Sequence, residues 1–131
     1  MTRARWRRIG WAASGLWALA IFVVSAVPGS DLPGGFSIPG HFIEYAVLGG
    51  LLYFSLRFDL DRGRALALAV VIASAYGITD EFHQSFVPLR TPDPRDWLLD
   101  TLGALAGAAI VALALAVHER RAIRREATER G

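Results

Sequence analysis

The sequence predicts an all-α integral membrane protein, a four-helix bundle, and two observations support this. The chain has 131 residues, of which 53% are hydrophobic, and its mean hydropathy is +0.37. An ordinary soluble domain is less apolar than this. The apolar residues are also gathered into four blocks, each near the ~20 residues that a helix needs to cross a bilayer. We therefore expect a single transmembrane domain over residues 1–131.

The four blocks predict four helices and a charged tail, over about residues 9–27, 41–58, 65–87, 94–117 and 118–131, and the tail is expected to continue the last helix and to fray. The third apolar stretch ends at Thr79, which makes it too short to span a bilayer. Its helix must therefore continue into the polar residues that precede Pro88. Asp93 followed by Pro94 is typical of an N-cap and a first helical residue, so the fourth helix is expected to begin there.

The arginines predict the orientation of the chain. All 14 basic residues are arginine, and all but Arg90 and Arg95 flank the expected helices on one side of a four-pass chain. Cytoplasmic flanks carry an excess of basic residues, so both termini are predicted to lie inside. A net charge of +2, with the arginines at membrane flanks, gives no indication of a nucleic-acid partner. The absence of cysteine excludes disulfides and thiolate metal ligands.

The first apolar block has an alternative interpretation as a secretory signal peptide. Arginines precede it, and Val24-Ser25-Ala26 has the small residues of a cleavage site. The apolar part of a signal peptide, however, runs to only about 7 to 15 residues, and the block over 9–27 is longer. Its removal would also put the two remaining basic flanks on opposite sides of the membrane. A first transmembrane helix is the better interpretation.

Polar residues lie at those helix ends that are predicted to face the outside. Ionisable groups within a membrane are costly, so their presence indicates a function. On the second helix, His41, Glu44 and Tyr45 share one face. The antiparallel order of the helices brings this end beside the end of the third helix and the start of the fourth. The residues expected to line one outward-facing polar pocket are His41, Glu44, Tyr45, Asp80, Glu81, His83, Gln84, Arg90, Asp96 and Asp100.

Glycines predict close helix packing behind this pocket. Gly103 and Gly107 form a small-xxx-small motif on the fourth helix, and Gly49 and Gly50 lie midway along the second. Membrane helices are rich in glycine in any case, so the motif could also reflect composition alone. We favour a role of these glycines in helix packing.

Together these motifs resemble the VanZ family of small bacterial membrane proteins. The segments that carry the resemblance are His41 to Tyr45 with Leu48-Gly49, Gly77 to Glu81 with Gln84, Arg90, and Asp96 with Asp100 to Gly103 and Gly107. They cover roughly residues 28–107. The resemblance implies a cell-envelope protein of the bacterial plasma membrane, and the founding member is associated with resistance to the glycopeptide teicoplanin. It implies no settled reaction.

The chain departs from the family's pattern at two places. Pro39-Gly40 precede the histidine, where the family often has an acidic or basic residue. The position of Asp100 is frequently asparagine in the family, which indicates that hydrogen bonding is the main contribution of this residue.

An enzyme is the first functional hypothesis. Glu44 and Glu81 are candidate general acids or bases, with His41 or His83 as partner and Asp80 beside them. The substrate would be a lipid-linked envelope precursor or a phospholipid, whose anionic headgroup Arg90 would bind. The further candidate binding residues are Gln84, Tyr45, Asp96 and Asp100. Nitrogen and oxygen ligands also suit a divalent metal such as zinc or manganese, although no tight ligand motif is present.

Other functions remain open at this point. The same residues would serve an accessory protein that recognises a headgroup or an antibiotic without turnover, or they would form mutual ion pairs that only support the structure. A transporter needs a polar path through the membrane, whereas the inner halves of the expected helices are apolar. An oligomer would provide such a path, but the sequence does not define the oligomeric state.

Overall fold

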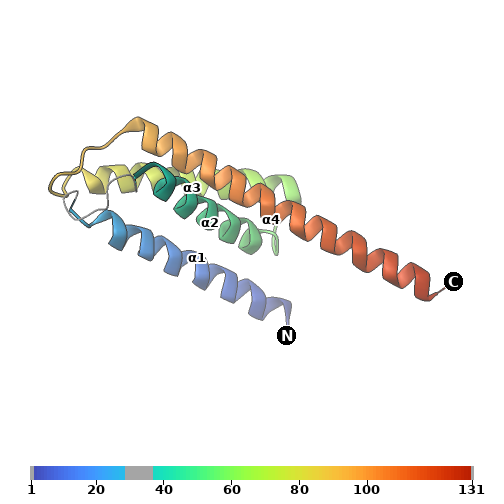
Figure 1. Cartoon of the computed structure of the whole chain (residues 1–131). Coiled ribbons are helices and arrows are strands. Elements are labelled where there is room, and N and C mark those ends of the chain that lie inside the picture. The colour runs from blue at the N-terminus through green and yellow to red at the C-terminus, as the bar shows by residue number, and fades with distance from the viewer. Residues whose placement is uncertain (1, 29–36, 131) are drawn as a thin grey trace.

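The computed structural model describes residues 2–28 and 37–130, and these residues form four helices and no strand. The helices are α1 (Arg3–Ser25), α2 (Ser37–Leu56), α3 (Arg62–Gln84) and α4 (Pro94–Glu129). They run alternately in opposite directions, so the ends of α1 and α3 lie beside the starts of α2 and α4 (Figure 1). The predicted all-α fold is confirmed, and the orientation in the membrane stays a prediction.

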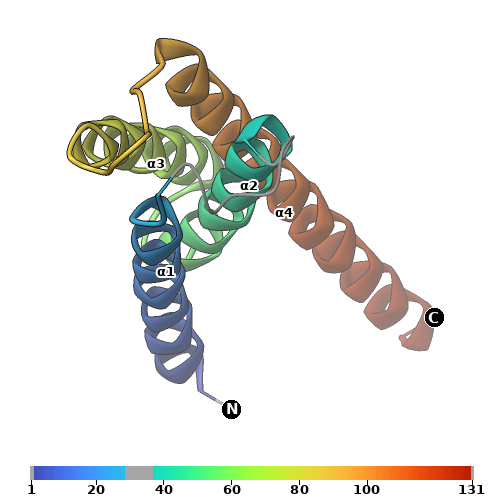
Figure 2. The ribbon, with the colours of Figure 1, turned by 60° about the vertical axis from the view of Figure 1, so that its left-hand side comes forward.

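Helix α2 is the centre of the bundle. It packs most extensively against α4 and also contacts α1 and α3. Figure 2 shows α1 and α4 on opposite sides of α2, with α3 beside them. The side chains that α2 buries in the core are Tyr45, Leu48, Leu52, Tyr53 and Leu56.

The bounds of α3 differ from the predicted ones at both ends. It begins at Arg62 because the side chain of Asp61 caps it and accepts a hydrogen bond from the Arg64 backbone N–H at 3.0 Å. It ends at Gln84, three residues before the expected end. The residues that follow form tight turns instead. Pro88 explains this, because proline disfavours a helical backbone in the residue before it.

Helix α4 runs twelve residues past residue 117 into the charged tail and extends well beyond the other three helices (Figure 1). Arginine, glutamate and alanine dominate this extension, and all three are strong helix formers. Glu119 pairs with Arg62, and its other oxygen lies 3.9 Å from Arg57 Nη2, which ties the start of the extension to the α2–α3 connection.

Three of the four helices, α1, α3 and α4, are long and apolar enough to cross a membrane. Helix α2 is not among them, and the polar His41 and Glu44 in its first turns lower its hydropathy. Large apolar side chains are exposed on the outside of the bundle, for example Leu16, Val71 and Ile110. Helices that are apolar on the outside as well as the inside are typical of membrane proteins. The four-pass topology itself stays a prediction.

The predicted close packing of α2 on α4 is confirmed. A Cβ atom added at Gly49, Gly103 or Gly107 would collide with backbone atoms of the facing helix. The strongest overlap would be between position 107 and the carbonyl oxygen of Ala46. Gly50 has more room, since its nearest neighbour would lie 3.1 Å away. These glycines bring the two helices close enough to place polar groups of both at the same end.

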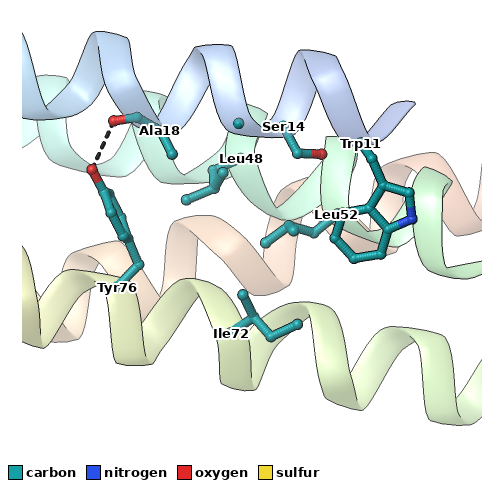
Figure 3. A pocket seen from close by; sticks show the side chains of 8 residues that line it. Trp11, Ser14, Ala18, Leu48, Leu52, Ile72 and Tyr76 are labelled. Carbon is teal, nitrogen blue, oxygen red and sulfur yellow. Dashed lines mark hydrogen bonds between the residues drawn. The ribbon is translucent and has the colours of Figure 1, made fainter. Parts of the chain in front are cut away.

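A pocket of about 210 Å³ lies between α1, α2 and α3, away from the polar end of the bundle. Apolar side chains such as Trp11, Leu52 and Ile72 form most of its wall (Figure 3). At one end the Tyr76 hydroxyl donates a hydrogen bond to the Ala18 carbonyl at 2.7 Å. No acid, arginine or histidine lines this pocket, so it is distinct from the polar pocket that the sequence predicts.

Candidate functional site

Helices α2, α3 and α4 place polar side chains together at one end of the bundle. On α3, the buried face carries Ala65, Ala69, Ala73 and Gly77, and the same face continues with Asp80, Glu81 and Gln84. His41 from α2 and Asp100 from α4 are also buried, with 6% and 0% of their surface exposed. Charged side chains are almost never buried to this degree unless they have partners. Each of these groups is therefore expected to have a partner.

His41 and Asp100 form a buried pair across α2 and α4. The Nδ1 atom of His41 lies 3.0 Å from Asp100 Oδ1. An ionised carboxylate only accepts hydrogen bonds, so the pairing places a proton on Nδ1 and fixes the plane of the ring. The second ring nitrogen, Nε2, lies 3.9 Å from Asp96 Oδ2, which is too far for a hydrogen bond. Nε2 is thus left to act as a base or as a ligand.

Glu81 reaches toward this pair from α3. Its Oε2 accepts a hydrogen bond from the Asp93 backbone N–H at 2.8 Å, which joins the end of α3 to the start of α4. Its other oxygen, Oε1, is buried and has no hydrogen-bond partner among the described residues. One oxygen or nitrogen atom from each of His41, Glu81 and Asp100 lies within 4.8 Å of the other two. We call these three residues the outer cluster.

Asp100 has a second oxygen that the histidine does not use. Its Oδ2 is buried without a hydrogen-bond partner among the described residues. It lies over Gly77 of α3, where an added Cβ would come within 3.1 Å of it. The absence of a side chain at position 77 therefore leaves room for this carboxylate between α3 and α4.

Asp80 and Gln84 were predicted to act in catalysis and binding, and the structure pairs them with each other. Gln84 Nε2 donates to Asp80 Oδ2 at 3.0 Å, and the Ser25 hydroxyl of α1 donates to Asp80 Oδ1. Both oxygens of Asp80 are therefore occupied by protein donors. This arrangement holds α1 against α3, and no hydrogen bond joins Asp80 to the outer cluster.

Glu44 and Arg90 lie at the periphery of the outer cluster. Both are half-buried, and no hydrogen bond joins the Glu44 carboxylate to the described residues. It is close enough to interact electrostatically with His41, Asp80 and Asp100. The Arg90 guanidinium donates through Nε to the Val27 carbonyl at 3.3 Å. The Arg90 charge also acts on the Glu44 carboxylate, in a site that is otherwise rich in acids.

The remaining predicted residues, His83 and Tyr45, form no hydrogen bond with the His41–Asp100 pair. The His83 ring stacks on Phe22 of α1, with ring centroids 4.2 Å apart. Tyr45 is fully buried in the core, where its hydroxyl has no partner among the described residues. Sequence reasoning missed Ser25 and Phe22, because α1 was not expected to contribute to the polar end. The one signal in the sequence for such a contribution was the hydroxyl group of Ser25, in the last turn of an apolar helix.

The fold and the site define a class: a helical membrane protein with a buried acid and histidine cluster at one end of its bundle. Residues 36–115 match the VanZ/LLP1 family, and the chain belongs to this family. The matched segment holds α2, α3 and most of α4, and thus all of the outer cluster, whereas α1 lies before it. No curated protein and no solved structure was found to match the chain. The resemblance seen in the motifs is confirmed.

Proposed function

We propose that this chain is a four-pass protein of the bacterial plasma membrane that acts on the anionic headgroup of a lipid-linked envelope precursor or a phospholipid. The observation that carries the proposal is the outer cluster, which is buried in a bundle whose core is otherwise mainly apolar. An acid near the centre of a membrane helix costs about 2.5 to 3.5 kcal/mol. Several such groups at one place therefore indicate a functional site.

The predicted orientation puts the outer cluster at the level of the outer leaflet. Both termini would lie in the cytoplasm, together with all arginines except Arg90 and Arg95. The polar end would then meet lipid headgroups on the outer face, where envelope precursors are used. The apolar surfaces of the helices would keep the acyl or prenyl chain of such a lipid in the bilayer.

The geometry supports proton transfer by two groups. His41, held by Asp100, would take a proton from the attacking water or hydroxyl through Nε2. Glu81 in its protonated form would give a proton to the leaving oxygen through Oε1, which has no hydrogen-bond partner among the described residues. Arg90 would bind a phosphate oxygen with the nitrogens that do not contact Val27. General acid and base groups in such positions each contribute about 10²- to 10⁴-fold to a rate.

The test is lipid mass spectrometry on membranes that contain the wild type, His41→Gln or Glu81→Gln at matched abundance, with added lipid-linked cell-wall precursors. His83→Gln is the matched control, because the His83 ring stacks on Phe22 of α1 and makes no hydrogen bond to His41 or Asp100. We expect one lipid species to change with the wild type and with His83→Gln but not with the other two variants. Identical lipid profiles for all four proteins would refute turnover.

An accessory role is the second candidate, and one observation favours it. His41 Nδ1 and Glu81 Oε2 are already bound to protein groups, so part of the cluster supports the structure. An accessory protein would recognise a headgroup or a lipid-tailed glycopeptide without converting it. It would leave the lipid profiles identical, while wild type and His41→Gln would still differ in the protection of cells against teicoplanin.

A further inference from the structure

We propose that His41, Glu81 and Asp100 bind a divalent transition metal ion of the zinc or manganese type. The three residues come from α2, α3 and α4, and one donor atom of each lies within 4.8 Å of the other two. Zinc and manganese accept imidazole nitrogen together with carboxylate oxygen, and the chain has no cysteine that would select softer metals. Such a site would also join the three helices at one point.

The independent support is a pair of buried oxygens without partners. Glu81 is 9% exposed and Asp100 is fully buried, yet Glu81 Oε1 and Asp100 Oδ2 accept no hydrogen bond from the described residues. A buried acceptor without a partner costs free energy, and the cost is larger for a charged group. Both oxygens belong to the outer cluster. A cation bound between them would satisfy both at once.

The contacts of His41 have the pattern of a metal ligand. A histidine that binds a metal through one ring nitrogen generally donates the other N–H to a carboxylate or a carbonyl, which orients the ring. In His41 the metal ligand would be Nδ1, which lies 3.0 Å from Asp100 Oδ1, and the carboxylate beside Nε2 is that of Asp96, with Oδ2 at 3.9 Å. The ion would take the place of the proton between Nδ1 and Oδ1, with Asp100 and Glu81 as the oxygen ligands.

The spacing fits an ion after a moderate adjustment. Metal–ligand distances of about 2.0 to 2.2 Å place neighbouring ligands of a tetrahedral ion about 3.3 to 3.6 Å apart. His41 Nδ1 and Asp100 Oδ1 are already within this spacing at 3.0 Å. The donor atoms of the outer cluster lie within 4.8 Å of one another, so the widest pair needs to close by up to about 1.5 Å.

The charge of the surroundings also favours a cation. At this end of the bundle, electrostatic interactions link five acids: Glu44, Asp80, Glu81, Asp96 and Asp100. The positive charge of Arg90 acts on Glu44. A divalent ion would reduce the mutual repulsion of these carboxylates. It would leave coordination positions for water or for a phosphate oxygen, which it would polarise as a Lewis acid. That last role rests on the proposed function, whereas the binding of the metal does not.

The test measures metal binding alone. Purified full-length protein in detergent, with any affinity tag removed and prior metal extracted by a chelator, is titrated with Mn²⁺ and with Zn²⁺ by calorimetry. Metal content after dialysis is counted by mass spectrometry. We expect one ion per chain, and an affinity that falls by about tenfold or more in Asp100→Asn and in Glu81→Gln.

Asp80→Asn is the matched control, because Asp80 is the neighbour of Glu81 on α3 and its oxygens are taken by Ser25 and Gln84. It should weaken binding by about threefold or less, through the loss of one nearby charge. Tryptophan fluorescence confirms that each variant is folded before it is titrated.

Two results would overturn the metal site. The first is a wild type that binds neither ion with a Kd below about 100 μM. The second is equal binding by the wild type, Asp100→Asn and Glu81→Gln, which would place the ion elsewhere. Because no lipid is present, either result is distinct from a failure of the proposed lipid chemistry. Metal binding without lipid turnover would instead support the site and refute the proposed reaction.

Discussion

Gly107→Ala is expected to destabilise the bundle, although alanine is the better helix former. The added Cβ would collide with the carbonyl oxygen of Ala46 and would lie 2.5 Å and 2.8 Å from the carbonyl carbon and Cα of the same residue. These are backbone atoms, so no change of rotamer relieves the overlap. Helices α2 and α4 must separate by more than an ångström, because ordinary contact begins at 3.4 Å and the carbonyl oxygen lies still closer than the carbonyl carbon.

The magnitude follows from two opposing effects. A radial gap of about 0.5 to 1 Å forfeits a quarter to a half of the dispersion energy of the atoms facing it. Overpacking costs about 1 to 3 kcal/mol, and a collision with backbone on the largest interface of the bundle puts position 107 at the upper end. The better helix propensity of alanine offsets about 1 kcal/mol of this cost. We expect a net loss of about 2 kcal/mol in the free energy of unfolding.

The assay is unfolding in mixed detergent micelles with increasing dodecyl sulfate, followed by the fluorescence of the four tryptophans. Gly15→Ala is the matched control, because a Cβ at position 15 on α1 would meet nothing within 4 Å. There the same substitution should stabilise the protein by up to about 1 kcal/mol. A Gly107→Ala protein as stable as Gly15→Ala would refute the close approach of α2 and α4.

Three further predictions use the same unfolding assay. Ser25→Ala removes a donor from the buried Asp80 carboxylate and should cost about 1 to 3 kcal/mol, whereas an unchanged stability would show that α1 does not hold this group. Trp17→Phe removes the 2.8 Å hydrogen bond from the indole to a carbonyl of α2 and should cost about 1 kcal/mol; no loss would contradict the contact between α1 and α2. The backbone N–H of Arg64 holds the pKa of the Asp61 carboxyl below its usual range. The stabilisation by the Asp61 charge is therefore present above the usual pKa of the group, and it is lost as the pH falls through the lowered pKa of the folded protein. Asp61→Ala should therefore be less stable than the wild type at neutral pH, and the gap should close below about pH 4; a gap that does not change with pH would argue against a charged cap.

Much of the architecture is determined by the sequence itself. The four helices, the fold class and the close approach at Gly103 and Gly107 follow from local properties: the length of apolar blocks, the spacing of small residues and the turn residues between them. The family was also recognisable from motifs on three helices. The continuation of α4 into the charged tail was also predictable. The ends of α3 were less so, because capping by Asp61 depends on an individual contact with a neighbouring residue.

Only the tertiary structure decides which polar atoms meet. His41 and Asp100 are 59 positions apart in the chain, and Ser25 and Asp80 are 55 apart. The sequence placed His41, Asp80 and Asp100 at one end of the bundle. It did not separate Asp80, whose oxygens accept from Ser25 and Gln84, from the outer cluster with its two unpartnered oxygens. The physical reason is that a periodic pattern defines the face of one helix. The rotation and spacing of neighbouring helices, set here by backbone contact at the glycines of α2 and α4, define which faces touch.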